Sequence, residues 1–378
     1  MNRSRLPSTL SRSWLLLAAS VAWAVQAQTP ATLPEAPAPQ AASGRAAMLL
    51  LLPAQSTAFA RPAEAVREGF FAAHKVSGDD VALQVVETDD SAEQLAAALA
   101  SARDRGVAVI VGPLRRAAVT DVVEGGRTTV PLLALNFPEA DGAALPTMLA
   151  VALSLEVEAQ RVAKMAFSEF VGKRSADTRP RIAIITRPAN LERRIASAYM
   201  AALRSEGEVP LLIEWTPATA ARVGRQLAVS GLEAVFLALT ARDAAQMRAL
   251  IPREAQVFGT SLLNAGDPRA SPDAATLAHD LEGVRFVDMP WLLEPDHSGV
   301  MVYPRYATAQ SMEMVRLYAF GIDAYRIASA WMKGERRFDI DGVTGRLQID
   351  RPRSLRVDRT PVLATYRSGE LRRIDIAR

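Results

Sequence analysis

The sequence predicts an α/β protein with two Rossmann-like lobes, each built around a parallel sheet, joined as a bilobal clamshell. Two observations lead to this fold class. Short apolar runs alternate with amphipathic helical segments through most of the chain, and the same alternation starts again after a polar break at residues 172–180. This pattern is typical of βαβ units, whose parallel strands are buried on both faces. With 378 residues, of which 49% are hydrophobic, the chain is long enough to bury two such cores.

The first 43 residues differ in composition from the rest and are expected to lie outside the folded body. Three arginines and no acidic residue accompany an apolar run at residues 14–24, which ends in Val25-Gln26-Ala27. This order is typical of a secretory signal peptide, here residues 1–27 with cleavage after Ala27, and the run is too short to span a membrane. Residues 28–43 contain four prolines and many alanines, so we expect an extended linker. Loss of residues 1–27 would leave 41 basic and 41 acidic residues, a balance that predicts no nucleic-acid partner.

The first lobe is expected at residues 44–171. Its strands are predicted where short apolar runs occur, at residues 48–52, 81–86, 107–111 and 130–135. Helices are predicted between them, around residues 65–73 and at residues 91–103, 117–124 and 154–171. Ser91 is the first residue of the second of these segments and is predicted to be the N-cap of its helix.

The second lobe is expected at residues 172–282, and residues 283–378 are expected to return to the first lobe and complete both. Strands are predicted in the second lobe at residues 181–185, 211–215, 234–239 and 256–259, with helices at 191–205, 218–230 and 242–250. The last hundred residues contain a strand-like segment at 283–288, a long helix at 311–332 and a hairpin-like tail from Val343 onward. The long helix has a narrow polar stripe and is apolar over most of its circumference, so we expect it to be buried between bodies. The stripe consists of Glu313, Arg316, Asp323, Arg326 and Lys333.

The sequence lacks the residue patterns by which catalytic and metal sites are recognised. It has no cysteine, and its three histidines are far apart in polar surroundings. Neither a dinucleotide-binding nor a Walker glycine pattern follows a strand, and Asp339–Gly342 lacks the later ligands of a calcium loop, so we predict a turn there. We therefore expect no catalytic residue, no metal and no cofactor, and the sequence favours a protein that is not an enzyme.

A ligand site is expected in the cleft between the lobes, because ligands of open parallel sheets bind beyond the carboxyl ends of the strands. Each candidate residue follows a predicted strand, and each has an alternative interpretation as a loop cap or turn residue. The candidates are Gln55, Ser56, Thr57, Leu114, Arg115, Asn136, Arg187, Thr240, Thr260 and Ser261. Trp291 is added because it follows the return of the chain toward the first lobe, although a core or hinge position is favoured over ligand stacking.

Several local sequences resemble a known superfamily. Gly112-Pro113-Leu114, residues 131–136 and residues 341–350 resemble the type I periplasmic-binding-protein-like superfamily. Residues 259–264, 280–293 and 316–325 are similar to the C-terminal domain of LpoA-type penicillin-binding protein activators. This resemblance implies a non-catalytic periplasmic protein that binds and stimulates a class A penicillin-binding protein, which synthesises peptidoglycan. Family members are commonly lipoproteins, but without a cysteine we expect no lipid anchor on this chain.

Two alternative functions follow from the same fold. The first is a solute-binding protein of an ABC importer that recognises an amino acid or a similar small molecule in the cleft. Such proteins usually place small hydroxyl residues after the Gly-Pro turn to hold a ligand carboxylate, whereas Leu114, Arg115 and Arg116 stand there in this chain. Arg115 would suit another anion. The second alternative, an enzyme that acts on cell-wall material, lacks a visible catalytic constellation.

Overall fold

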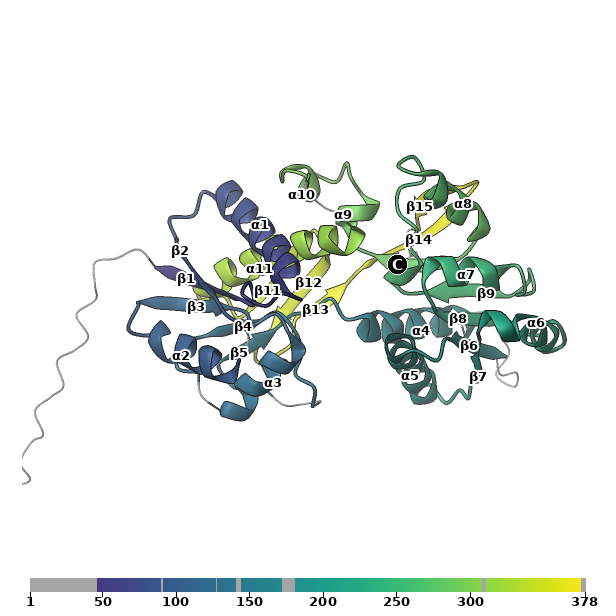
Figure 1. Ribbon diagram of the computed structural model, residues 1–378, viewed down its shortest axis with the longest axis horizontal. Helices are drawn as coiled ribbons and strands as arrows, with labels where there is room; N and C mark the ends of the chain where they lie inside the picture. Colours follow the sequence, from purple (N-terminus) through teal and green to yellow (C-terminus); the bar gives the residue numbers. More distant parts are fainter. Residues whose placement is uncertain are drawn as a thin grey trace, which may run out of the picture. The chain divides into compact units, whose positions relative to one another are not determined.

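The structure is a computed structural model that describes residues 46–89, 91–126, 128–140, 144–171, 181–307 and 311–374. The expected signal peptide and linker lie outside the described residues. Within these residues two α/β cores are each built on a sheet of mainly parallel strands, as the alternating sequence pattern predicts (Figure 1). The fold class is therefore confirmed.

The first sheet has five parallel strands in the order β2-β1-β3-β4-β5. They are β1 (Ala47–Leu52), β2 (Ala82–Glu87), β3 (Val107–Val111), β4 (Leu132–Ala134) and β5 (Met148–Ala150). All six residues of β1 are buried, and Leu50 lies opposite Val85 of β2 and Val111 of β3. Continuous apolar sequence is what a central strand covered on both faces requires. The sequence pattern predicted the first four strands, whereas the three-residue β5 is too short to stand out.

Helices cover both faces of the first sheet. They include α1 (Ala60–Ser77), α2 (Ala92–Ala102) and α3 (Arg116–Gly125). As predicted, Ser91 caps α2, since its Oγ accepts a hydrogen bond from the Gln94 amide at 3.3 Å. α2 and α3 bury their apolar residues with Leu49, Leu51 and the inner residues of β4, while α1 contributes to the core on the opposite face.

The second sheet has seven strands in the order β15-β14-β10-β9-β8-β6-β7. Five of them are parallel: β6 (Ile182–Thr186), β7 (Leu211–Glu214), β8 (Ala234–Ala238), β9 (Gln256–Gly259) and β10 (Arg285–Asp288). The hairpin of β14 (Val362–Arg367) and β15 (Glu370–Arg373) adds antiparallel strands beside β10. The surrounding helices are α5 (Asn190–Ser205), η1 (Pro217–Thr219), α6 (Ala220–Val229), α7 (Ala241–Arg248), η2 (Ser261–Leu263) and α8 (Pro272–Asp280).

Helix α4 (Leu155–Val171) packs on the second sheet, although the sequence pattern grouped it with the first lobe. Its buried face includes Ala159, Val162 and Ala166, which share a core with Ile184 of β6 and Phe258 of β9. The polar break that follows the helix suggested a lobe boundary at residue 172. The packing places the passage from one core to the other before α4, because the apolar face of the helix belongs to the second core.

Helix α11 (Met312–Met332) is buried, as its apolar circumference predicted, and it lies within the first core. It runs beside α1 (Figure 1) at a distance that leaves no room for a side chain at two glycines. A Cβ atom on Gly69 would lie 1.8 Å from the Tyr318 carbonyl oxygen, and one on Gly321 would lie 2.1 Å from that of Val66. The short helices α9 (Pro290–Leu293) and α10 (Ser298–Met301) precede it.

A third sheet packs against the first core. It consists of β11 (Arg337–Gly342), β12 (Gly345–Asp350) and β13 (Asp358–Thr360), all antiparallel. A bridge between Ala150 and Arg356 attaches it to β5. The prediction of a turn at Asp339–Gly342 was wrong, because these residues pair with β12 and the turn falls at Val343 and Thr344.

Candidate functional site

The candidate residues of the first lobe gather at the carboxyl ends of β1, β3 and β4. The Asn136 Nδ2 donates to the Leu114 carbonyl oxygen at 3.1 Å, which ties the loop after β4 to the loop after β3. The Arg115 guanidinium lies 4.8 Å from the ring centre of Phe59, in the segment after β1. Gln55 donates from Nε2 to the Glu87 carbonyl oxygen. Each of these polar groups therefore has a partner within the lobe.

Ser56 and Thr57 lie in the same segment after β1. The Ser56 carbonyl oxygen accepts hydrogen bonds from the amides of Phe59 and Ala60, so this residue begins the turn into α1. Thr57 is exposed.

The candidate residues of the second lobe form a separate group at the ends of β6 and β8. The Arg187 guanidinium binds the Asp243 carboxylate at 2.9 Å and lies 5.7 Å from the ring centre of Trp215. Thr240 caps α7 by accepting a hydrogen bond from the Asp243 amide, and its hydroxyl donates to the same carboxylate. Asp243 thus neutralises Arg187, the one positively charged candidate residue at this edge of the sheet.

Thr260 and Ser261 follow β9 and are both buried. Among the described residues the Thr260 hydroxyl has no hydrogen-bond partner. Ser261 donates its amide to Glu158 at 3.0 Å and accepts a hydrogen bond from Arg316 at its carbonyl oxygen, also at 3.0 Å. Of the residues predicted from strand ends, Ser261 is the one that belongs to a buried network of charges.

Trp291 lies in the hydrophobic core of the first lobe and is 2% exposed. Its ring centre is 5.5 Å from that of Tyr318, and the Arg305 guanidinium lies 4.7 Å above it. The position is that of a core aromatic residue.

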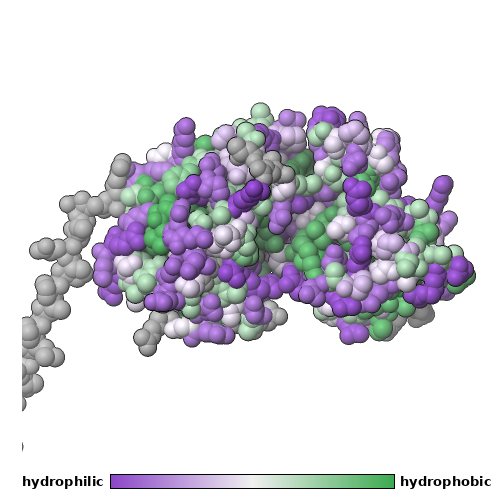
Figure 2. Space-filling model, in the orientation of Figure 1, coloured by the Kyte–Doolittle hydropathy of each residue, from purple (hydrophilic) through white to green (hydrophobic). Residues whose placement is uncertain are grey.

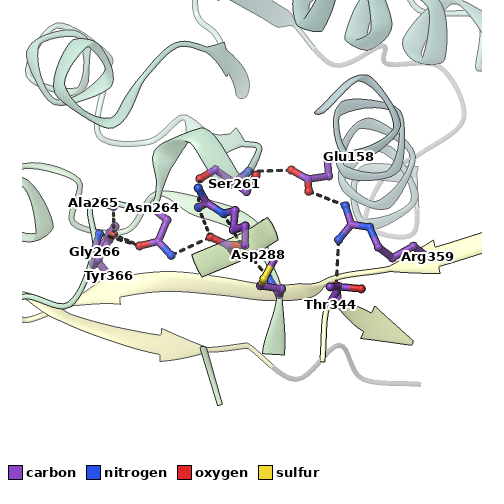
Figure 3. Close-up of polar contacts among 11 residues, drawn as sticks. Glu158, Ser261, Asn264, Ala265, Gly266, Asp288, Thr344, Arg359 and Tyr366 are labelled. Atoms are coloured by element: carbon purple, nitrogen blue, oxygen red, sulfur yellow. Dashed lines mark hydrogen bonds and ion pairs between the residues drawn. The ribbon is translucent and has the colours of Figure 1, made fainter. Parts of the chain in front are cut away.

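Glu158 and Arg359 form the centre of the buried network (Figure 3). Glu158 stands on α4 and Arg359 on β13, and each is 5% exposed. One terminal nitrogen of Arg359 donates to Glu158 Oε1 at 2.8 Å, and the other donates to the Thr344 carbonyl oxygen at 3.0 Å. The second oxygen of Glu158 accepts from the Ser261 amide, so both partners of this ion pair have further hydrogen bonds. Such additional bonds are what a buried ion pair needs to offset its loss of hydration.

A second ion pair, between Arg316 and Asp288, continues the network on the other side of Ser261. Arg316 of α11 donates to both oxygens of Asp288, at 2.6 and 3.3 Å. Asp288 also accepts from Asn264 at 2.8 Å and from the Met289 amide. Asn264 in turn accepts hydrogen bonds from the Gly266 amide and the Tyr366 hydroxyl. Burial raises the pKa of Tyr366 to about 12, so its hydroxyl is a donor at neutral pH.

Asp323 anchors the network to the turn between β11 and β12. It is fully buried and accepts hydrogen bonds from the amides of Val343 and Thr344, at 3.0 and 2.8 Å, and from the Thr344 hydroxyl. Burial raises its pKa, although Arg326 and these hydrogen bonds act in the opposite direction. The turn is held to α11 in this way, which positions the Thr344 carbonyl for Arg359.

Each of the three passages between the cores contributes a buried charge to this network. Glu158 follows the passage into α4, Asp288 ends β10 before the chain returns to the first core, and Arg359 precedes β14. Sequence reasoning singled out Arg316 and Asp323 as part of a polar stripe but missed these three residues. Asp288 could have been identified from its position, because it is a charged residue at the end of a strand from which the chain passes into the other lobe.

Four cavities in the described part of the chain are lined by residues other than the predicted ones. The most apolar lies between α2 and α3, and another lies between α5 and β7. In the described ranges no group of three or more His, Cys, Asp or Glu side chains is placed to hold a metal ion. None of the described helices combines the length and apolar content needed to cross a membrane.

The sequence matches the model of the family described as "LppC putative lipoprotein" over residues 27–227 and 173–369, which together include most of the chain. The chain belongs to the LppC family. Its curated relatives include "Penicillin-binding protein activator LpoA" of Photobacterium profundum, 25% identical over 333 residues, and the protein of the same name from Vibrio antiquarius, 26% identical over 344 residues. These matches cover 80% of this chain and 53% and 54% of the relatives, so this LppC chain spans about half the length of the curated relatives it matches.

Solved structures share the fold of this LppC family member. The C-domain of LpoA from Haemophilus influenzae, described as "a regulator of PBP1A", matches with a TM-score of 0.70 and 20% identity over 87% of this chain and 100% of that one. A protein from Chromobacterium violaceum, described as "a putative branched-chain amino acid ABC transporter", matches with a TM-score of 0.68 and 30% identity over 85% of this chain and 100% of that one. The type I periplasmic-binding-protein-like fold is thereby confirmed.

Proposed function

We propose that this protein is a non-catalytic regulator in the periplasm that binds a class A penicillin-binding protein and stimulates peptidoglycan synthesis. The observation that carries the proposal is the similarity to LpoA activators over four fifths of this chain, together with membership of the LppC family. The matched part of the relatives is long enough to contain both α/β cores. The expected export signal in residues 1–27 belongs to the proposal and lies outside the described residues.

The buried charged residues also support this proposal, because their bonds within the protein make it a rigid scaffold that can present its surface to a partner. Glu158, Arg359, Asp288 and Arg316 bond to one another or to backbone groups, and Arg187 binds Asp243. Groups held in this way fix the path of the chain between the cores. A fixed surface favours binding to another protein, because a preformed interface loses less conformational entropy on binding.

The test is a reconstituted synthesis assay with the full chain as the cell exports it. The chain is mixed with a class A penicillin-binding protein from the same organism, and glycan polymerisation and peptide crosslinking are followed separately. We expect direct binding and a faster rate in at least one of the two reactions. A class B transpeptidase serves as the matched control and should not respond. If the class A synthase neither binds the chain nor changes its rate, the proposal is wrong.

A solute-binding role is the second candidate, and the Chromobacterium violaceum protein favours it because the two chains match over the whole of that chain. In this role a small molecule would bind between the two groups of strand-end residues, with Arg115 and Asn136 on one side and Arg187 and Thr240 on the other. The hydrogen bonds that already occupy Asn136 and Arg187 weigh against it.

A further inference from the structure

Strand β7 forms the outer edge of the second sheet. It pairs in parallel with β6, from Leu211 opposite Ala183 to Glu214 opposite Thr186. The Trp215 amide donates to the Thr186 carbonyl oxygen at 2.8 Å. Because alternate residues of a parallel strand face the same neighbour, the amides and carbonyls of Leu212 and Glu214 point away from β6. Within the described ranges no segment pairs with them, so along this edge the donors and acceptors of β7 have no strand partner among the described residues.

Large apolar side chains are exposed along this edge. Val209, Leu211 and Leu212 are 79%, 40% and 50% exposed, and they are three of nine large apolar side chains exposed among the described residues. Figure 2 shows hydrophobic side chains at the lower edge of the molecule, where α5 and β7 lie in Figure 1. Edge strands are normally protected by charged side chains, by prolines or by a covering segment. Pro210 and Glu214 flank this edge, but Glu214 is paired with Arg193, and the apolar side chains beside them stay exposed among the described residues. Such exposure indicates a surface that another chain covers.

A groove of about 380 Å³ runs between this edge and α5. Its apolar part is formed by Leu212, Ala196 and Met200. Two arginines also line it. Arg193 is neutralised by Glu214, with 3.1 Å between Nη2 and Oε1, whereas Arg204 is exposed and has no ion pair within the described residues. The groove thus combines an apolar floor with one arginine that no described carboxylate compensates.

We infer that β7 and the α5 groove bind an extended segment of a partner protein, which adds to the sheet as a further strand beside β7. Hydrogen bonds to Leu212 and Glu214 would hold its backbone, an apolar side chain would contact Leu212 and Met200, and a carboxylate would bind Arg204. Strand addition at a sheet edge is a common mode of peptide recognition. The inference goes beyond the proposed function, since it concerns the chemistry of the bound segment whichever protein supplies it.

A second copy of this chain fits the surface less well. If two β7 strands paired with each other, each would bring its Glu214 to the other. That carboxylate already binds Arg193, so it is not available to Arg204. The charge of the groove therefore favours an acidic segment from a different protein.

The test selects peptides from a random library displayed on phage, with the full chain as the target. Enriched peptides are synthesised, and their dissociation constants are measured by fluorescence polarisation. Leu212→Pro removes one outward amide and leaves the amide of Trp215 bonded to β6, and proline is tolerated at such edge positions. Arg204→Glu reverses the free charge. Arg225→Glu, which changes another exposed arginine, on α6, is the matched control.

We expect enriched peptides that alternate apolar residues and carry a carboxylate. Leu212→Pro and Arg204→Glu should each weaken their binding by about fivefold or more, the scale of one lost hydrogen bond, while Arg225→Glu leaves it unchanged. Circular dichroism checks that each variant is folded. If Leu212→Pro fails to fold, slower hydrogen exchange of the Leu212 and Glu214 amides in the peptide-bound wild type replaces it as the readout.

Three outcomes would overturn the inference. The first is a library that yields no enriched peptide. The second is peptide binding that both variants retain, or bound peptides that leave the exchange of the two amides unchanged. The third is a dimer in sedimentation experiments that Leu212→Pro abolishes, which would assign the edge to a second copy of this chain.

Discussion

Glu158 and Arg359 form a buried ion pair between residues that lie 201 positions apart in the chain, with 2.8 Å between Oε1 and Nη2. The pair connects α4, which packs in the second core, to β13, which belongs to the sheet attached to the first core. Through Ser261 it is linked to the Arg316–Asp288 pair. The two cores are thus joined by covalent connections and by charges that have their hydrogen-bond partners on both sides.

Replacement of Arg359 by methionine should destabilise the protein strongly. The change removes the positive charge and leaves Glu158 buried with the Ser261 amide as its remaining donor in the network. Removal of one partner of a buried ion pair typically lowers the free energy of unfolding by about 3–5 kcal/mol. Urea unfolding of Arg359→Met, followed by tryptophan fluorescence, measures this loss.

Arg337→Met is the matched control, because Arg337 pairs with Asp350 at the surface, where the side chains are 70% and 39% exposed. An exposed pair contributes at most about 1 kcal/mol. Equal losses for the two variants would contradict a special role for the buried pair. Combining Arg359→Met with Glu158→Leu should restore part of the stability, since no uncompensated charge then remains in the core.

Gly321→Ala should disturb the contact between α1 and α11. The new methyl group would lie 2.1 Å from the Val66 carbonyl oxygen, which is backbone and has little freedom to move. Overpacking of this kind costs about 1–3 kcal/mol of unfolding free energy. Gly125→Ala is the control, because nothing lies within 4 Å of its Cβ position, and it should be neutral or stabilising by up to about 1 kcal/mol. An unchanged melting temperature for Gly321→Ala would show that the two helices separate easily.

Asp79 should contribute to the loss of stability in acid. The Ser329 hydroxyl, together with Lys333 and Tyr325, lowers the pKa of this carboxyl below its ordinary value. Its contribution is therefore present above the pKa of the unfolded chain and disappears as the pH falls through the folded pKa. Melting temperatures of Asp79→Asn between about pH 5 and about pH 2 should fall less steeply than those of the wild type. The exposed Asp296→Asn is the control, and if both variants parallel the wild type, Asp79 has no such role.

The strands and much of the helical pattern could be predicted from the sequence because they depend on local signals. Continuous apolar runs identified β1, β3 and β8, and a serine before an alanine-rich segment identified the cap of α2. The sequence pattern also predicted correctly that the candidate residues follow the ends of strands. Their partners could not be predicted, because Arg187 meets Asp243 and Leu114 meets Asn136 only once the strand order is known.

The buried network lay beyond sequence reasoning for a physical reason. A buried charge is stable where its counter-charge and donors are in place, and here those come from separate parts of the chain. Asp323 illustrates the difficulty. On the sequence it belongs to a polar stripe typical of a solvated helix face, yet it is fully buried and bonded to the turn at Val343 and Thr344. The apolar circumference predicted the burial of the helix, but without the position of that turn nothing in the polar stripe marks Asp323 as a fully buried member.

The free amino acids leucine, isoleucine, valine and glutamate should leave the melting temperature unchanged at millimolar concentration. In the second lobe Asp243 already binds Arg187, the arginine that a ligand carboxylate would need. In the first lobe the side-chain amide of Asn136 is already bonded to the Leu114 carbonyl oxygen. A ligand present at about 100 times its dissociation constant would stabilise the fold by about 2.7 kcal/mol, which a thermal-shift measurement detects readily. The same panel is applied to Arg187→Met. Stabilisation of the wild type by one amino acid, lost in this variant, would favour the solute-binding role over the regulatory one.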